Sequence, residues 1–406
     1  MKATLVTGVK GGVWFSLIDK VFAPATLVAA WAKVHGNRGA AGVDGQSVER
    51  FAAGADRYLA ELSQSLREGT YAPAAIRRVE IPKGDGRTRP LGIPVVKDRI
   101  VQTAVKFVLE PILEAMFAPG SYGFRPGLGC KDALGEVDRL VKSGHHYVVD
   151  ADLASYFDTI PHARLMDRLR AKVSDGRVLG LVQSWLTQEI MGECGRWTPA
   201  AGTPQGAVIS PLLANLYLHP LDGLVASRGF AMVRYADDFV ILCDSMEKAQ
   251  AALALVRSWT EENGLTLHPD KTHIGDCRIK GQGFEFLGYR FEAGMRLVRK
   301  KSMARLRDAI RVKTRRTSGI SLSATVKALN PVLKGWFGYF RHAIASTFPD
   351  VDGFVRRRLR AILRKQAKIP GFGKSIEDSR RWPNAFFTNA GLFTMTTALK
   401  QIALPR

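Results

Sequence analysis

Two apolar segments of the sequence end in aspartates, and this combination constrains the fold more than any other feature. Residues 146–152 (HYVVDAD) predict a buried strand that ends at Asp152. Residues 230–243 form two apolar runs on either side of Asp237 and Asp238, which is typical of a β-hairpin. Unpaired carboxylates are costly in an apolar sheet, so their charge must be compensated.

A divalent metal ion would supply that compensation. Mg²⁺ prefers a few carboxylate oxygens together with phosphate oxygens of a substrate. Two such ions about 4 Å apart activate an attacking hydroxyl and stabilise the leaving oxygen in phosphoryl transfer. One carboxylate at a strand end and one or two from a neighbouring hairpin suit this chemistry. A plain turn remains the alternative for the hairpin, because Asp is a common turn residue.

The basic charge of the chain points to a polyanionic partner. The 406 residues include 59 Lys and Arg against 37 Asp and Glu, a net charge of +22. Such an excess favours nucleic acid first and an anionic membrane second. Residues 290–381 hold 24 Lys or Arg against 6 Asp or Glu, a net charge of +18. Within them, residues 354–365 predict an arginine-rich helix, either a phosphate-tracking surface or a solvated basic face.

Cysteine usage and hydropathy exclude several other classes. The four cysteines show no CxxC pair, so the sequence predicts neither a disulfide framework nor a zinc site, and a reducing cytoplasm is the expected location. The sequence has no run of about 18 uncharged apolar residues, so we expect no spanning helix and no membrane partner. The first residues do not form a convincing signal peptide, because Lys10 and Asp19 interrupt the apolar stretch.

Periodicity predicts a mixed α/β body followed by an all-helical basic module, with the boundary near residues 290–305. The expected helices before this boundary are 50–68, 98–117 with a break at Pro111, 161–172, 175–190, one opening at 211–218, and 245–263. The expected strands are 76–83, 146–152, 230–243 as a hairpin, 265–267 and 283–291. Beyond about residue 300 the pattern is helical.

Eight short motifs follow one another in a sensible order. They are NRGAAGVDG (37–45), IPK with RPLGIP (81–94), SYGFRP (121–126), Asp152 with YFD (152–158), GTPQG with SP (202–211), YADD (235–238), Leu265 with KT (265–272) and FLGY (286–289). A further segment is LNPVLKGWFGYF (329–340). With these motifs, residues 37–392 resemble the reverse transcriptase–maturase proteins encoded by bacterial group II introns.

The resemblance implies an α+β right-hand polymerase fold, with fingers and a palm built on antiparallel sheet and an all-α thumb or maturase domain. The implied domains are 1–75 (N-terminal extension and first fingers region), 76–295 (fingers and palm) and 296–406 (thumb and maturase). Many relatives carry a metal-binding endonuclease module after the maturase segment. The residues after Met395 lack Cys and His, so we expect no endonuclease domain.

Catalytic roles can be transferred to this sequence residue by residue. Asp152, Asp237 and Asp238 match the catalytic carboxylates of the family, and the first two are the surest metal ligands. The backbone carbonyl of Ala151 would add another ligand. The expected cofactor is a pair of Mg²⁺ ions, with Mn²⁺ as an alternative.

The resemblance also implies a deoxynucleotide site. Lys83 and Arg89 match the basic pair that holds the triphosphate, where cations neutralise the leaving group. Phe157 lies where an aromatic ring excludes a 2′-hydroxyl, and it could equally be a core residue. Gln205 would contact the nascent base pair or the incoming nucleotide. Lys271 is a candidate proton donor or phosphate contact, with an ordinary surface lysine as the alternative.

The expected partners are an intron RNA template, a DNA primer or target DNA, and dNTPs, with monomer or homodimer left open. The residues expected to contact nucleic acid are basic side chains in both halves of the chain: Arg125, Lys334, Arg341, Arg356, Arg357, Arg360 and Arg364. The resemblance implies RNA-directed DNA synthesis by two-metal nucleotidyl transfer, combined with maturase binding of intron RNA. Two alternatives remain: a domesticated reverse transcriptase in defence or DNA repair, and a splicing cofactor with little polymerase activity.

Overall fold

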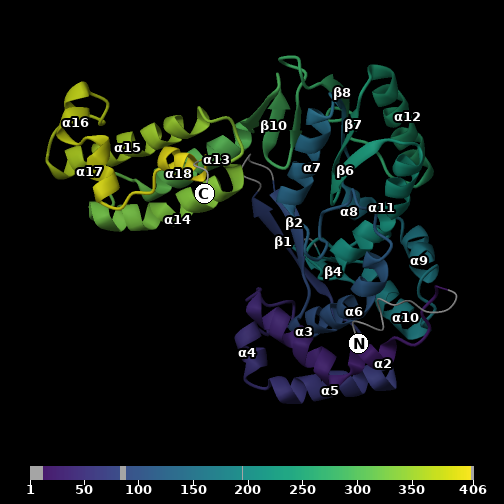
Figure 1. The fold of residues 1–406 in the computed structure, drawn as a ribbon. Coiled ribbons are helices and arrows are strands. Elements are labelled where there is room, and N and C mark those ends of the chain that lie inside the picture. Colours follow the sequence, from purple (N-terminus) through teal and green to yellow (C-terminus); the bar gives the residue numbers. More distant parts are fainter. Residues whose placement is uncertain (1–11, 83–87, 194, 404–406) are drawn as a thin grey trace. The chain divides into compact units, whose positions relative to one another are not determined.

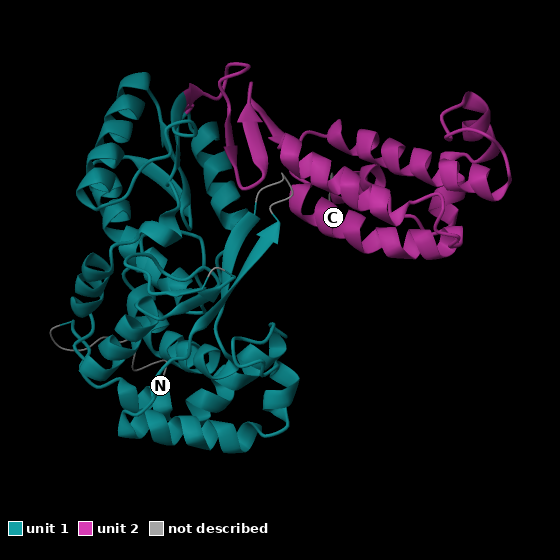
Figure 2. Cartoon of the chain, turned by 180° about the vertical axis from the view of Figure 1, so that it is seen from behind, with its two compact units in different colours: residues 1–145, 149–274 teal, residues 146–148, 275–406 magenta. Residues whose placement is uncertain are grey.

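The chain folds into two compact units, shown in Figure 2. The structure is a computed structural model, and it describes residues 12–82, 88–193 and 195–403. Unit 1 comprises residues 1–145 and 149–274, and unit 2 comprises residues 146–148 and 275–406. The predicted α+β class is confirmed, because unit 1 mixes helices with sheet and the end of the chain is helical.

Unit 1 begins with helices that pack around one long, buried helix. The short helices are α2 (Ile18–Phe22), α3 (Pro24–Gly36), α4 (Val48–Ala52) and α5 (Ala55–Glu68). The long helix is α6 (Val96–Glu114), which contacts α2 and α3. Its Ile100, Ala104 and Val108 are completely buried. The predicted break at Pro111 is wrong, since α6 continues through this residue.

A buried aspartate ties the N-terminal segment to the rest of unit 1. Asp175 caps α10 (Gly176–Leu186) by accepting hydrogen bonds from the backbone of Arg177 and Val178. Its second oxygen accepts from the backbone N–H groups of Leu17 and Ile18 at 2.7 and 2.9 Å. Burial acts to raise the pKa of Asp175, but these four donors hold that pKa below its usual value.

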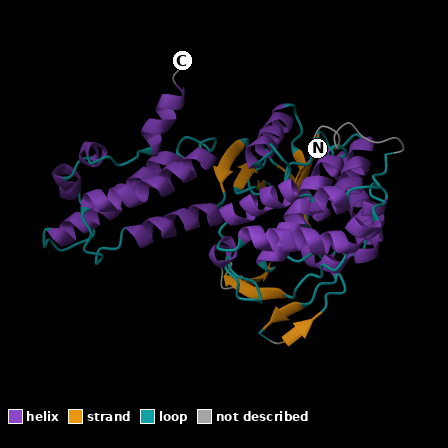
Figure 3. Ribbon diagram, turned by 90° about the horizontal axis from the view of Figure 1, so that it is seen from below, coloured by secondary structure: helices purple, strands orange, loops and turns teal. Residues whose placement is uncertain are grey.

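The first sheet of unit 1 has the strand order β2-β1-β4-β5. β1 (Ile76–Pro82) is the strand predicted at 76–83, and it pairs with β2 (Thr88–Ile93) in antiparallel orientation. β4 (Ile190–Gly192) runs parallel to β1, and β5 (Gly195–Trp197) returns antiparallel to β4. In Figure 3 the strands lie in small groups among the helices.

The second sheet has the order β6-β7-β3-β8 and carries the aspartates. β3 (Tyr147–Asp152) is the predicted buried strand, and β6 (Ala231–Tyr235) with β7 (Asp238–Cys243) is the predicted hairpin. β8 is His273–Asp276. The helices after β3 are α8 (Tyr156–Thr159), α9 (His162–Arg170) and α11 (Ser210–Ser227). α7 (Cys130–Lys142) contacts β6, and α12 (Met246–Glu262) contacts β7 (Figure 1). The strand predicted at 265–267 is wrong, because only one isolated bridge, Leu153 to Leu267, forms there.

Unit 2 joins a three-stranded sheet to a group of helices. The sheet has the order β11-β10-β9, formed by β9 (Phe284–Phe286), β10 (Tyr289–Glu292) and β11 (Met295–Val298). The helices are α13 (Lys300–Lys313), α14 (Leu322–Phe340), α15 (Thr347–Gln366), α16 (Ile376–Arg381), α17 (Asn384–Asn389) and α18 (Met395–Ala403).

The sheet belongs with the helices because aromatic residues connect them. The Tyr289 hydroxyl donates to the carbonyl of Tyr339 at 2.6 Å, and the Tyr339 hydroxyl donates to the carbonyl of Leu287 at 2.7 Å. Tyr289 also lies 5.0 Å from Phe340, centroid to centroid. Unit 2 therefore starts before the boundary predicted at residue 295. Within the described ranges, no helix has both the length and the apolar character needed to cross a membrane.

Candidate active site

The hairpin of β6 and β7 carries the predicted carboxylates on a two-residue turn. Tyr235 pairs with Asp238 at the end of the ladder, so Ala236 and Asp237 make the turn. Short hairpin turns favour left-handed backbone, and Ala236 has a φ of +62°. This conformation costs a non-glycine residue about 1 kcal/mol. The surrounding structure must therefore hold the turn in place.

The SYGFRP motif supplies one wall of this turn. The backbone N–H of Tyr122 donates to the carbonyl of Arg234, and the N–H of Arg234 donates to the carbonyl of Gly120, both at 2.8 Å. A Cβ added to Gly123 would lie 2.2 Å from the backbone nitrogen of Ala236. Only glycine allows this approach, which explains why the motif contains it.

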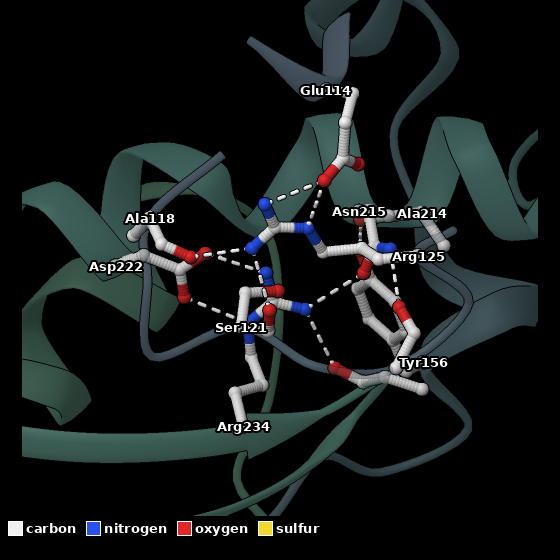
Figure 4. Close-up of polar contacts among 11 residues, drawn as sticks. Glu114, Ala118, Ser121, Arg125, Tyr156, Ala214, Asn215, Asp222 and Arg234 are labelled. Carbon is white, nitrogen blue, oxygen red and sulfur yellow. Dashed lines mark hydrogen bonds and ion pairs between the residues drawn. The ribbon is translucent and has the colours of Figure 1, made fainter. Parts of the chain in front are cut away.

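The buried side chain of Arg234 holds the turn through a hydrogen bond to its backbone, within a network of polar contacts (Figure 4). The Arg234 side chain is 0% exposed and forms a bidentate ion pair with Asp222, with N···O distances of 2.7 and 2.5 Å. Its third nitrogen donates to the side-chain oxygen of Asn215 at 2.9 Å and to the carbonyl of Ala236 at 2.8 Å. Arg234 thus fixes the carbonyl next to Asp237. Arg234 is not among the predicted site residues, although an arginine inside the apolar run FAMVRY was a visible signal.

Arg125 belongs to the same buried region, which corrects its predicted role. Its guanidinium pairs with Glu114 at 2.6 Å and donates to the carbonyls of Ala118 and Ser121 at 2.7 and 2.6 Å (Figure 4). The side chain is 10% exposed. Its donors are used inside unit 1, so the geometry does not fit a nucleic-acid contact.

Asp152 ends β3 and forms an ion pair with Lys271. The loop that carries Lys271 is fixed to the strand: the His268 N–H donates to the carbonyl of Asp152 at 2.7 Å, and the Ala154 N–H donates to the carbonyl of Thr266 at 2.8 Å. The lysine is 57% exposed and the aspartate 33%. Lys271 thus contacts a predicted catalytic carboxylate, and its role as a proton donor or phosphate contact stays a prediction.

The negative charge of Asp152 affects the pKa of Asp237. Burial raises the pKa of Asp237 above its usual value, and the charge of Asp152 raises it further, while Arg234 and Lys271 oppose the shift. Across the described ranges, no three His, Cys, Asp or Glu side chains gather into a metal-binding group. Asp152 and Asp237 fit a divalent cation by their chemistry, as two oxygen donors whose charges repel each other. Asp238 is half-buried at the start of β7, and Ala151 is completely buried in β3.

A cavity of about 270 Å³ brings together two of the predicted nucleotide contacts, Phe157 and Gln205. The Gln205 amide donates to the carboxylate of Asp158 at 3.3 Å. Close backbone packing shapes this cavity. The Gly92 N–H donates to the carbonyl of Gln205, and the Thr203 N–H donates to the carbonyl of Phe157, both at 2.6 Å. The GTPQG motif therefore joins β2 to the segment that carries Phe157.

The predicted triphosphate pair of Lys83 and Arg89 is not tested by the structure. Lys83 lies outside the described residues. Arg89 is exposed on β2, where it pairs with Ile81 across the hairpin, and it does not line the cavity. Its role as a phosphate contact stays a prediction.

The cavity also contains two residues that the sequence analysis did not select. Trp197 and Arg78 line it, and the Arg78 guanidinium lies 5.4 Å from the centre of the Trp197 ring. Trp197 is 37% exposed, which is unusual for so large an apolar ring. An exposed aromatic beside a cation can stack on a base. The signal was a lone tryptophan in the polar segment GRWTP.

Two of the four arginines predicted on α15 have structural partners instead, which corrects their assignment. Arg360 is 8% exposed and donates to the carbonyl of Trp382 and to the side chain of Asn384, both at 3.0 Å. Arg364 forms an ion pair with Asp378. These contacts attach α16 and α17 to α15, so neither guanidinium faces outward.

The remaining basic residues of unit 2 keep accessible positions. Arg357 is exposed and Arg356 half-buried on α15. Lys334 is exposed on α14, with its ammonium 5.9 Å from the Phe393 ring. Arg341 ends α14 and contacts His342 at 3.2 Å. Their contacts with nucleic acid stay predictions.

Two family models match the chain. Residues 81–291, more than half of the chain, match reverse transcriptase (RNA-dependent DNA polymerase). Residues 303–381 match the maturase-specific domain of group II introns. The first match contains both sheets of unit 1 from residue 81 onward, with the aspartate hairpin, and the second covers most of the helices of unit 2.

Known proteins are similar to the chain over different lengths. Protein YkfC of Escherichia coli is 35% identical over 305 residues, which cover 64% of this chain and 76% of YkfC. Group II intron-encoded protein LtrA of Lactococcus lactis subsp. cremoris is 34% identical over 219 residues, which cover 51% of this chain but only 36% of LtrA. A chain of a solved Cas6-RT-Cas1–Cas2 complex is 28% identical, with a TM-score of 0.39 and coverage of 61% of this chain and 41% of that chain.

The strand-borne aspartates, the glycine-walled turn and the ordered motifs agree with these matches. The chain belongs to the reverse transcriptase family of RNA-dependent DNA polymerases, and it carries a maturase-specific domain of the group II intron type.

Proposed function

We propose that unit 1 copies RNA into DNA at the strand ends that carry Asp152, Asp237 and Asp238. Reverse transcriptases depend on divalent metal ions, and in this chain Asp152 and Asp237 would hold Mg²⁺, with Asp238 and the Ala151 carbonyl as further candidate ligands. The bound ions would activate the primer hydroxyl and stabilise the leaving oxygen. The observation that carries the proposal is that Asp152 ends β3 and Asp237 lies in the β6–β7 turn of the same sheet, with Lys271 paired to Asp152.

The side chains of this chain have separate tasks in that reaction. Lys271 neutralises Asp152 in the structure, and its exposed ammonium can contact a phosphate once another cation takes over this role. Phe157 and Gln205 line the cavity that would receive the sugar and base of a dNTP. Arg234 positions the turn of Asp237 without touching substrate. Trp197 would stack on a base at the same cavity.

Primer extension on an RNA template, with Mg²⁺ and dNTPs, tests the polymerase. We expect wild type to make full-length DNA and Asp237→Asn to make none, with RNA affinity nearly unchanged, because one carboxylate contributes little to RNA binding. A matched control is Asp244→Asn, an exposed aspartate just beyond the end of the same strand that should leave synthesis intact. DNA synthesis by Asp237→Asn at the wild-type rate would overturn the proposal.

A second function, binding of intron RNA, is supported by the charge of unit 2 and by the match at 303–381. Tight, salt-sensitive RNA binding without DNA synthesis by wild type would favour a splicing cofactor over a polymerase. DNA synthesis without preference for intron RNA would instead favour a domesticated enzyme of defence or repair.

A further inference from the structure

Helices α13 and α15 of unit 2 line an open surface cavity of about 400 Å³ that the proposed polymerase reaction does not use. Six residues line it: Arg307, Arg311, Asp350, Gly353, Phe354 and Arg357. Its volume falls within the range of pockets that hold small molecules, roughly 300–1,000 Å³. Three arginines and one aromatic ring make up most of this lining.

The three arginines surround the ring of Phe354. Their guanidinium carbons lie 5.9 Å (Arg307), 5.7 Å (Arg311) and 5.2 Å (Arg357) from the ring centre. Arg307 and Arg311 are one turn apart on α13, and Phe354 and Arg357 are one turn apart on α15. The two helices therefore form an arginine cage, in which the guanidinium groups of Arg307, Arg311 and Arg357 lie over the ring of Phe354.

Little negative charge compensates this cage. Arg311 pairs with Asp308 at 2.5 Å, whereas Arg307 and Arg357 have no ion-pair partner in the part of the chain that the structure describes. The one carboxylate that lines the cavity is Asp350, so the lining keeps a net charge of +2. The cage thus holds more positive charge than its own carboxylates balance.

A neighbouring arginine shows the same crowding. Arg358 donates to the hydroxyl and carbonyl oxygens of Thr314 at 2.9 and 2.8 Å. Burial lowers the pKa of Arg358, and the charges of Arg311, Arg357 and Arg316 lower it further. Like charges that share so small a volume repel each other, and a bound anion would relieve this repulsion.

We propose that this cavity binds one unpaired nucleotide of single-stranded RNA. The base stacks on Phe354 among the guanidinium groups, and the adjoining phosphates contact Arg307, Arg311 and Arg357. Asp350 offers an acceptor to an amino group of the base. An unpaired base is required, because the bases of a duplex are already stacked on both faces and leave none free for the ring. The proposal rests on the RNA-binding function of unit 2, since the cavity lies within the maturase-specific match at 303–381.

Fluorescence anisotropy with a labelled single-stranded RNA, and with a blunt RNA duplex of the same sequence, tests the proposal in the full chain. Phe354→Leu keeps an apolar side chain but removes the flat ring. We expect it to weaken single-strand binding about tenfold, because base–aromatic stacking contributes roughly 1–3 kcal/mol. Duplex binding and the salt dependence should not change. Phe354→Tyr keeps an aromatic ring at this position, so its affinity should equal that of wild type.

A charge variant gives an independent measurement. Arg307→Gln, Arg311→Gln and Arg357→Gln combined should weaken single-strand binding and lower the slope of log affinity against log salt by about 2. The matched control combines Arg305→Gln, Lys365→Gln and Arg380→Gln, which removes the same charge from exposed positions outside the cavity. This control should change the slope by less than half as much.

Three results would overturn the proposal. The first is that Phe354→Leu binds single-stranded RNA with wild-type affinity. The second is that the cavity variant and the control charge variant lower the affinity and the salt slope equally. The third is that Phe354→Leu weakens duplex binding as much as single-strand binding. Photocrosslinking of RNA that contains 5-iodouridine should modify the peptide with Phe354, and a cross-link elsewhere only would count against the site. Primer extension distinguishes a failure of this proposal from a failure of the proposed polymerase function. Wild type can fail to make DNA while its binding of single-stranded RNA still depends on Phe354.

Discussion

The arginines of the two units show that one residue type serves opposite purposes, depending on its partners. In unit 1, Arg234 and Arg125 are buried or nearly so, and each has a carboxylate and backbone carbonyls to satisfy its donors. In unit 2, Arg307 and Arg357 face a cavity and have no carboxylate partner within the described ranges. Buried, paired arginines fix backbone, whereas crowded, unpaired ones are available to an external anion.

The largest effect is expected at Arg234, which belongs to the buried, paired arginines that fix the backbone. Arg234→Met leaves the carboxylate of Asp222 buried without a partner, so the free energy of unfolding should fall by about 3–5 kcal/mol. Urea denaturation followed by circular dichroism measures this loss. The exposed Arg170, paired with Asp167, is the matched control, and Arg170→Gln should cost less than about 1 kcal/mol.

A double variant separates stability from positioning. Arg234→Met with Asp222→Leu replaces the ion pair by apolar side chains and should recover most of the lost stability. Primer extension should stay low, because the carbonyl of Ala236 still lacks its donor. Recovery of both stability and synthesis would show that Arg234 does not position the turn of Asp237.

Arg125 sharpens the comparison, because the sequence had placed it on the nucleic-acid surface. Arg125→Gln should lower the free energy of unfolding by about 2 kcal/mol, since Glu114 and two carbonyls lose a charged donor. RNA affinity and its salt dependence should match those of wild type in anisotropy titrations. A smaller salt slope without a loss of stability would restore the original prediction.

These arginines also show how far sequence reasoning reaches. The strand that ends at Asp152 and the hairpin whose turn carries Asp237 were predictable, because apolar runs and turn residues are local signals. Which arginines are buried was not, because their partners lie on other elements: Asp222 for Arg234, and Asn384 for Arg360.

The candidate site likewise contains residues that the sequence could identify and an arrangement of them that only the fold shows. The motifs selected Phe157 and Gln205 individually, but only the fold shows that both line one cavity. Lys271 was left open between a functional and a surface lysine, and its ion pair with Asp152 depends on a loop held by backbone hydrogen bonds. The short strand predicted at 265–267 failed because that segment makes a single bridge rather than a ladder.

Within α15 the comparison can be made between neighbours. Arg360→Gln should lower the free energy of unfolding by about 1–2 kcal/mol, because the carbonyl of Trp382 and the side chain of Asn384 lose their donor. Arg357→Gln should change stability by less than about 0.5 kcal/mol and instead weaken single-strand RNA binding. Thermal melts and anisotropy titrations on the same preparations measure both. The reverse pattern would contradict the division into paired and unpaired arginines.

The smallest effect concerns the paired arginine Arg364 and the pH dependence of its partner. Burial acts to raise the pKa of Asp378, but hydrogen bonds from Arg364 and Ser375 outweigh it and hold that pKa below its usual value. A carboxyl whose pKa is lower in the folded state contributes stability above the unfolded pKa of about 3.9. This contribution is lost as the pH falls through the folded value.

Urea denaturation of wild type and Asp378→Asn between pH 7 and pH 3 tests this expectation. At pH 7 the variant should be less stable by about 1 kcal/mol, because a neutral amide replaces the charged acceptor of Arg364 and Ser375. The difference should shrink below about pH 4, where wild type also loses the negative charge of Asp378. If the difference stayed constant with pH, then the charge of Asp378 would contribute nothing to stability, and the attachment of α16 would depend on contacts such as those of Arg360 with Trp382 and Asn384.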